Sequence, residues 1–296
     1  MRKLLLTSLT IFYCFVLSAQ SVEVQADYNS AGDCVFSAYN NSKVPVFLHL
    51  KFGDLQNTSF SEPVPYVKQL TPGFNDLFTL LRYEGEDVPR FNYEIKMFRS
   101  NPLAKIDFDF PYLIPLQEGK TAMFFDVESI DGFWGQGKLS SWTAVGFRVE
   151  PGEDVIASRN GIVVEIVGAE RKGDAASWYN TWTNAVTVLQ PDGTLLCYHN
   201  LTVDEKSLKP GDKIYAGQIL GQVIQGASDL VLLMYYTSLF SDDPKFIIPK
   251  FIHDDGKTDI LNSSTPYVVT HPYEVRALEM TKKEQRQVLG KNLKSQ

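Results

Sequence analysis

The sequence is poor in the two residue types that most often bind transition metals. It contains four histidines and three cysteines among 296 residues, and no histidine lies between His49 and His199. Imidazole and thiolate groups are the usual ligands of zinc in proteins. The long central part of the chain therefore has no imidazole with which to build a metal site.

The sequence also lacks long apolar runs and an excess of basic charge. A membrane-spanning helix needs about 20 consecutive apolar residues, and the apolar run over residues 4–17 is shorter and has no counterpart later in the chain. The formal net charge is −7, unlike the basic surface of a nucleic-acid-binding protein. We expect neither a membrane span nor a nucleic-acid partner.

The first residues have the pattern of an export signal. Arg2 and Lys3 precede the apolar run, and the small residues Ser18 and Ala19 follow it. This order is typical of a cleaved secretory signal peptide, which we place at residues 1–21. The mature protein is then expected in the periplasm or outside the cell.

Removal of the signal leaves two cysteines, Cys34 and Cys197. A disulfide could persist in an exported protein. The two residues fall in what we expect to be different domains, and small apolar cysteines are often simply buried. Two unpaired, buried thiols are therefore the favoured expectation.

The rest of the chain has the pattern of an all-β protein. Runs rich in β-branched and aromatic residues at 22–26, 44–52 and 93–98, separated by turn residues, predict a small Ig-like β-sandwich over residues 22–110. Strand and turn signals continue over residues 111–278. In the tail, residues 279–296, Thr281 is placed to cap a short helix that ends before Gly290.

Three segments of the second region share an order and spacing with a known peptidase family. They occupy residues 144–164, 184–201 and 208–221. The third reads Leu-Lys-Pro-Gly-Asp-Lys-Ile-Tyr-Ala-Gly-Gln-Ile-Leu-Gly. Together they resemble the scaffold of M23 (LytM-like, lysostaphin-type) zinc peptidases. The resemblance implies an antiparallel β-sheet domain, here preceded by an extra N-terminal β domain.

The residues that would hold zinc in this family are replaced. The family uses two His and one Asp, with an open position for water. Aligned on Gly152, Ala157 and Gly161, the first His and the Asp fall on Trp142 and Gly146. The family's His-x-His strand should follow Gly226, which places the last His on Leu232. None of these side chains can hold a charged metal. The alignment predicts no zinc site and no bound cofactor.

The catalytic histidine positions are replaced as well. They fall on Asn200 and Leu230, while His199 stands one residue before the first of them. On a strand, a shift by one residue turns a side chain to the opposite face. We therefore expect His199 to be a poor substitute unless the backbone bulges there.

Aromatic residues are the candidate binding groups of the second region. In the family's architecture, the segments that carry them would flank the groove, where aromatic faces stack on sugars or cover peptides. Core packing is the competing explanation and the more common role of such residues. The candidates are Trp134, Trp178, Tyr179 and Trp182.

Three functional hypotheses follow. The first is a secreted, catalytically inactive M23-like protein that binds a peptidoglycan fragment or an envelope protein. The second is a diverged zinc metallopeptidase acting on peptidoglycan peptides, with ligands such as His199, His253 and Asp254, although a hydrated turn is the simpler role for the last two. The third is a lipoyl- or biotinyl-type carrier domain. Such a carrier requires a lysine at an exposed hairpin, and the connecting segment around Asp192 and Gly193 has none.

Overall fold

The computed structural model describes residues 22–127, 141–169, 184–204, 206–254 and 256–290. The described residues form mainly strands, with two short helices near the C-terminus, so the all-β prediction is confirmed. No helix in these ranges is long and apolar enough to cross a membrane. The signal peptide assigned to residues 1–21 lies outside the described residues and stays a prediction.

The N-terminal part is a β-sandwich of two three-stranded antiparallel sheets, β1-β2-β5 and β4-β3-β6. Alternate residues of β2 are buried, as expected of a strand with one face on a core. Phe36 lies at the centre of that core, and its ring stacks on Phe78 at 4.7 Å between centroids. The strands are β1 (Val22–Tyr28), β2 (Cys34–Asn40), β3 (Val46–Gln56), β4 (Tyr66–Leu70), β5 (Gly73–Leu80) and β6 (Arg90–Phe98).

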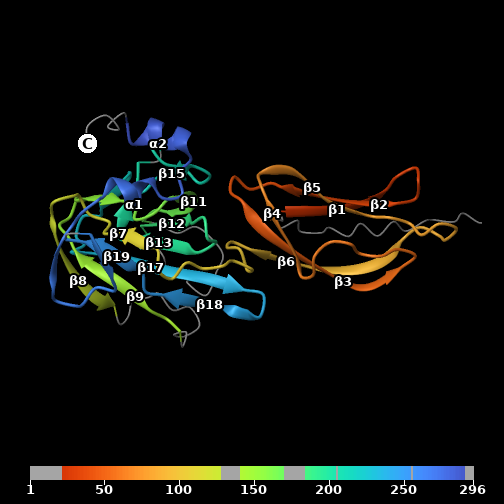
Figure 1. The fold of residues 1–296 in the computed structure, drawn as a ribbon, viewed down its shortest axis with the longest axis horizontal. Helices are drawn as coiled ribbons and strands as arrows, with labels where there is room; N and C mark the ends of the chain where they lie inside the picture. The colour runs from red at the N-terminus through yellow and green to blue at the C-terminus, as the bar shows by residue number, and fades with distance from the viewer. Residues whose placement is uncertain (1–21, 128–140, 170–183, 205, 255, 291–296) are drawn as a thin grey trace, which may run out of the picture.

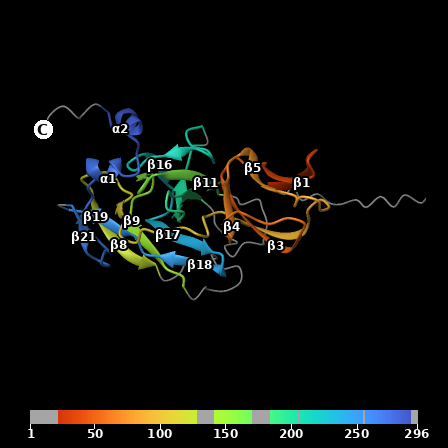
Figure 2. The same cartoon turned by 45° about the vertical axis from the view of Figure 1, so that its right-hand side comes forward.

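The second part is built around a nine-stranded sheet with the order β15-β11-β12-β13-β17-β9-β8-β21, and β18 pairs with β17. Figure 1 and Figure 2 show it beside the sandwich along the long axis of the molecule. Its strands are β8 (Thr121–Val127), β9 (Ala144–Arg148), β11 (Gly161–Val167), β12 (Ala185–Leu189), β13 (Leu195–His199), β15 (Lys213–Ile214), β17 (Asp229–Ser238), β18 (Ser241–Ile247) and β21 (Pro266–Val268).

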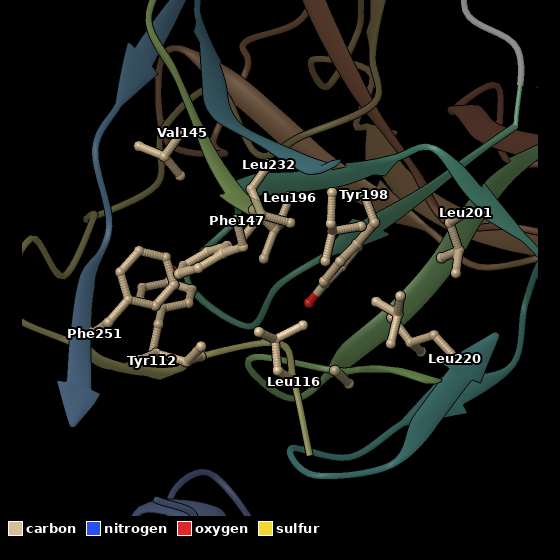
Figure 3. Packing of buried hydrophobic residues seen from close by; sticks show 14 of the residues in the cluster. Tyr112, Leu116, Val145, Phe147, Leu196, Tyr198, Leu201, Leu220, Leu232 and Phe251 are labelled. Carbon is tan, nitrogen blue, oxygen red and sulfur yellow. The ribbon is translucent and has the colours of Figure 1, made fainter. Parts of the chain in front are cut away.

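One face of this sheet, which we call the inner face, packs on the main hydrophobic core. Tyr198 and Leu232 are partners across β13 and β17, and both point into this core (Figure 3). Two small sheets cover it, β10-β16-β14 and β20-β19-β7. Their strands are β7 (Pro111–Leu113), β10 (Asp154–Ile156), β14 (Leu201–Thr202), β16 (Ile219–Val223), β19 (Lys250–His253) and β20 (Lys257–Asp259).

The opposite, outer face is apolar too, and the sandwich packs on one end of it. Phe47 and Phe98 of the sandwich contact Leu189, Leu195 and Tyr235, which are neighbours across β12, β13 and β17. Because both faces are buried, β12 shows no alternation of buried and exposed residues.

Cys34 and Cys197, the cysteines within the described residues, are both buried and unpaired. Cys34 belongs to the core of the sandwich, whereas Cys197 lies in an apolar cluster on the outer face of the large sheet. Burial raises the pKa of each thiol.

A buried arginine joins segments that are distant in sequence. Arg159 donates hydrogen bonds to the hydroxyl of Tyr112 at 2.8 Å and to Asp192 at 2.9 Å, and it forms an ion pair with Glu279. Its guanidinium group lies 3.7 Å from the centroid of the Phe110 ring. The arginine side chain is 1% exposed, so these partners supply the contacts that water would otherwise make.

The helix predicted in the tail is present. Helix α2 (Lys282–Val288) begins after Thr281, whose side chain accepts a hydrogen bond from the backbone of Glu284 while Glu284 bonds back to Thr281. This is a capping box. A shorter helix, α1 (Tyr273–Ala277), was not predicted, because five residues are too few to show helical periodicity.

We predict that Arg159→Ala lowers the free energy of unfolding by about 3–5 kcal/mol, because the substitution leaves the buried Asp192 without its partner. Urea unfolding followed by circular dichroism measures the change. The control is Arg90→Gln, which removes an exposed ion pair with Asp87 and should cost less than about 1 kcal/mol. Equal losses for the two variants would contradict the structural role of Arg159.

Candidate functional site

The position expected for the metal-binding Asp lies on the outer face of the large sheet. Gly146 of β9 is paired with Phe125 of β8 on one side and with Val231 of β17 on the other. Val231 is in turn paired with His199 of β13. Directly paired residues point to the same face, so these four positions form one row across the sheet.

An aromatic ring fills the space that a side chain at Gly146 would need. A Cβ atom built on Gly146 would lie 2.2 Å from Cζ of the Phe125 ring. The guanidinium group of Arg148 covers the same ring at 4.2 Å from its centroid. An aspartate at position 146 would therefore require Phe125 to move away.

Trp142, at the position of the first zinc-binding His, is packed rather than presented to solvent. Its side chain is 8% exposed and lies in an apolar cluster with Val231, Leu233 and Cys197. Ala144 and Ala185 complete the cluster. The surroundings of Trp142 are those of a hydrophobic core.

The two leucines aligned with the family's His-x-His pair do not share the face of Gly146. Leu230 is paired with Phe147 and Leu232 with Val145, and all four belong to the main core under the inner face. The residue beside Gly146 is Val231. The strand register predicted from the sequence therefore differs by one residue from the register in the structure. Leu230 and Leu232 do not lie beside Gly146.

The two candidates at the end of β13 also differ from the expectation. Asn200 has a left-handed backbone with φ +69°, and its side-chain amide donates to the carboxylate and the backbone carbonyl of Asp229 at 2.9 and 3.1 Å. Because the strand ends there, the face of Asn200 does not follow from strand alternation. His199 is the residue that shares the face of Gly146.

His199 is a mostly buried imidazole near one carboxylate. Burial lowers its pKa below the usual 6.5, and the negative charge of Asp229 offsets part of this effect. A neutral imidazole is therefore favoured in the folded protein.

The residues in this row do not fit a zinc ion. Zinc requires three or four nitrogen, sulfur or carboxylate ligands converging on one point. Here Gly146, Phe125 and Val231 offer no such donor. Nowhere among the described residues do three or more His, Cys, Asp or Glu side chains gather in a way that could hold a metal.

The four aromatic binding candidates, Trp134, Trp178, Tyr179 and Trp182, lie outside the described residues. The described residues that flank their two segments lie near the row. Val127 is paired with Ala144 where β8 ends and β9 begins, and Ala185, at the start of β12, is paired with His199.

His253 differs most from its expected role as part of a hydrated turn. It ends β19, and the residue is 5% exposed, although the turn follows immediately at Asp254. The apolar residues before it, Phe251 and Ile252, were the sequence signal for burial. Of the other histidines, His49 lies in β3, and His271 is buried with Nε2 3.3 Å from the carbonyl oxygen of Ile114.

Comparison with known proteins finds similarity among solved structures. No protein-family model and no curated protein matches the chain. The catalytic domain of lysostaphin from Staphylococcus simulans is 24% identical over 36% of this chain and 79% of that domain, with a TM-score of 0.26. The deep-sea M23 metalloprotease pseudoalterin is 11% identical over 55% of this chain and 97% of its own, with a TM-score of 0.33.

A third solved structure, Csd3 from Helicobacter pylori, is 12% identical over 86% of this chain and 55% of its own, with a TM-score of 0.30. Lysostaphin and pseudoalterin are described as peptidases. The activity of this chain depends on its own residues.

We predict that Gly146→Ala destabilises the protein by about 1–3 kcal/mol, because the new methyl group overlaps the Phe125 ring. Adding Phe125→Ala should remove most of this extra cost, which a double-mutant cycle from urea unfolding measures. Gly168→Ala is the matched control, since a Cβ there meets no atom within 4 Å. Additive effects of the two substitutions would show that the ring does not fill the site.

We also predict a loss of stability on mild acidification that depends on His199. The unfolded chain takes up a proton on this residue near pH 6.5, whereas the folded chain does so only at lower pH. The contribution of His199 to the unfolding free energy should therefore be fully present well above pH 6.5 and be lost as the pH falls through 6.5 toward the lower pKa of the folded state. The fall should be smaller in His199→Gln, and an identical pH slope in both proteins would refute the assignment.

Proposed function

We propose that the chain is a secreted, catalytically inactive M23-like module that binds peptidoglycan fragments in the periplasm or at the cell exterior. The observation that carries the proposal is the Phe125 ring at Gly146, which occupies the place of a metal-binding side chain with apolar carbon. Trp142 extends this apolar packing on the same side of the sheet.

The proposed module has the M23-like β-scaffold but does not hydrolyse peptide bonds. Hydrolysis of a peptide bond by this class of enzyme needs a metal that activates water and polarises the carbonyl group. Without converging ligands, the outer face can still present a surface to a ligand. The aromatic residues in segments 128–140 and 170–183 are the candidates for sugar and peptide contact.

The test is a binding assay paired with a hydrolysis assay. Mature protein supplied with zinc is incubated with purified peptidoglycan sacculi; we expect it to sediment with them and to release no stem-peptide fragments. A variant carrying Trp134→Ala, Trp178→Ala and Trp182→Ala should lose most of the binding. The control is Trp142→Phe, which keeps an aromatic ring in the apolar cluster and should bind normally.

Two outcomes would contradict the proposal. Fragment release that is abolished by chelation and by His199→Ala would establish a diverged zinc peptidase. Absence of sedimentation with sacculi, together with specific capture of an envelope protein, would retain the inactive module and replace its ligand.

A further inference from the structure

A second pocket lies where the β-sandwich meets the large sheet. It holds about 330 Å³, within the range of about 300–1,000 Å³ that is typical of small-molecule sites. Residues of β3 and β4 line it from the sandwich, and β11, the end of β12, the turn after β12 and β15 line it from the second part. None of its described lining residues belongs to the row around Gly146.

Part of the pocket wall is apolar. Phe47 of β3, Ile162 of β11 and Leu189 of β12 line it. Phe47 and Leu189 also belong to the apolar cluster that joins the two parts of the molecule, so the fold holds this wall in place. Apolar atoms of a ligand would be removed from water against it.

The charged groups at the pocket are already neutralised by partners. Lys213 forms an ion pair with Glu284, and Glu279 forms one with the buried Arg159. An ionic ligand would have to compete with these partners for its own counter-charge. The pocket therefore favours an uncharged ligand.

One buried carboxamide at the pocket has a fixed orientation. The guanidinium group of Arg159 can only donate, so the Tyr112 hydroxyl accepts its hydrogen bond at 2.8 Å and donates its own proton to Oε1 of Gln190 at 2.7 Å. The Thr194 hydroxyl also donates to this oxygen at 2.7 Å. Gln190 lines the pocket, whereas Tyr112 and Thr194 do not. The oxygen of the carboxamide is therefore bound to the protein, and the nitrogen is the atom left for a ligand.

That nitrogen is a hydrogen-bond donor without an acceptor. Gln190 is 3% exposed, and its Nε2 is buried with no hydrogen-bond partner among the described residues. A buried N–H group without an acceptor is unfavourable, and such groups in folded proteins usually have a protein, water or ligand partner. A ligand with a carbonyl oxygen would supply the missing acceptor.

Two further carboxamides line the same pocket. Oδ1 of Asn101 accepts a hydrogen bond from the backbone N–H of Leu103 at 3.0 Å, which leaves the amide nitrogen to donate. Gln69 of β4 is exposed, and its carboxamide both donates and accepts, as a sugar hydroxyl requires. Because Gln69 and Pro191 are exposed lining residues, they can shift to admit a ligand oxygen to Gln190.

The geometry points to a site for one uncharged, N-acetylated amino-sugar ring. The acetamido carbonyl accepts the hydrogen bond from Nε2 of Gln190, and the acetyl methyl group packs against Phe47 and Leu189. The ring hydroxyls meet the carboxamides of Gln69 and Asn101. The pocket volume, at the lower end of the small-molecule range, suits a single ring. The site goes beyond the proposed function and does not rest on it, because other residues form it.

The test is a nuclear magnetic resonance titration of the nitrogen-15-labelled mature chain with N-acetylglucosamine. We expect a saturable shift of the side-chain amide of Gln190, smaller shifts of those of Gln69 and Asn101, and one site per chain. Two comparison compounds should bind at least tenfold more weakly. Glucose has a hydroxyl in place of the acetamido group, and N-acetylalanine methylamide has the amide without the ring.

Two variants test the residues assigned to the site. Gln190→Glu keeps an oxygen that accepts from Tyr112 but replaces the donor by an acceptor, so binding should weaken at least tenfold. Gln69→Ala removes one hydrogen-bonding group from an exposed position, so it should weaken binding about two- to tenfold while the fold is kept. The matched control is Gln25→Glu, an exposed position on β1, which should bind as the parent does.

The inference is overturned if Gln190 shows no saturable shift, if either comparison compound binds as well as N-acetylglucosamine, or if both variants bind as the parent does. Sugar binding that survives in Gln190→Glu but is lost in the variant with three Trp→Ala substitutions would place the sugar on the aromatic segments. That result would overturn this inference and leave the inactive-module proposal standing. A saturable Gln190 shift in a chain that does not sediment with sacculi would do the reverse.

Discussion

Burial of the large sheet on both faces is the constraint on which the rest of the structure depends. Strands β12 and β13 and the first part of β17 are buried almost without interruption. The two small sheets cover the inner face, and the sandwich together with the Trp142 cluster covers much of the outer face. Removal of this apolar surface from water is the main favourable contribution to such a fold.

The same constraint favours apolar residues at the positions that the sequence alignment predicts for metal ligands. A buried His or Asp without a metal or another partner carries a large desolvation cost. At the row around Gly146, the carbon atoms of the Phe125 ring lie against the glycine, and Val231 belongs to the apolar cluster on the outer face, so no such cost arises. The row around Gly146 is therefore occupied by apolar carbon on both neighbouring strands.

Tertiary contacts hold two of the buried polar side chains of this molecule in place. Arg159 is fully buried because Asp192, Glu279 and Tyr112 reach it from three separate segments. His253 is buried because β21 brings Val268 against Asp254, which holds the imidazole from one side. In the second case Nε2 of His253 lies 3.8 Å from the carboxylate of Asp259.

The sequence by itself determined the class of fold, because strand and turn patterns are local. It also determined the capped helix after Thr281 and the absence of imidazole between His49 and His199. It did not determine the register of β17, since the residues from Leu230 to Tyr235 are all apolar and no polar residue marks either face. Only pairing with β9 and β13 decided that Val231 lies beside Gly146 and His199. The short distance between the side chains of His253 and Asp259, 3.8 Å from Nε2 to Oδ2, was likewise not determined by the sequence alone. It depends on how strands β19 and β20 pair in the folded hairpin.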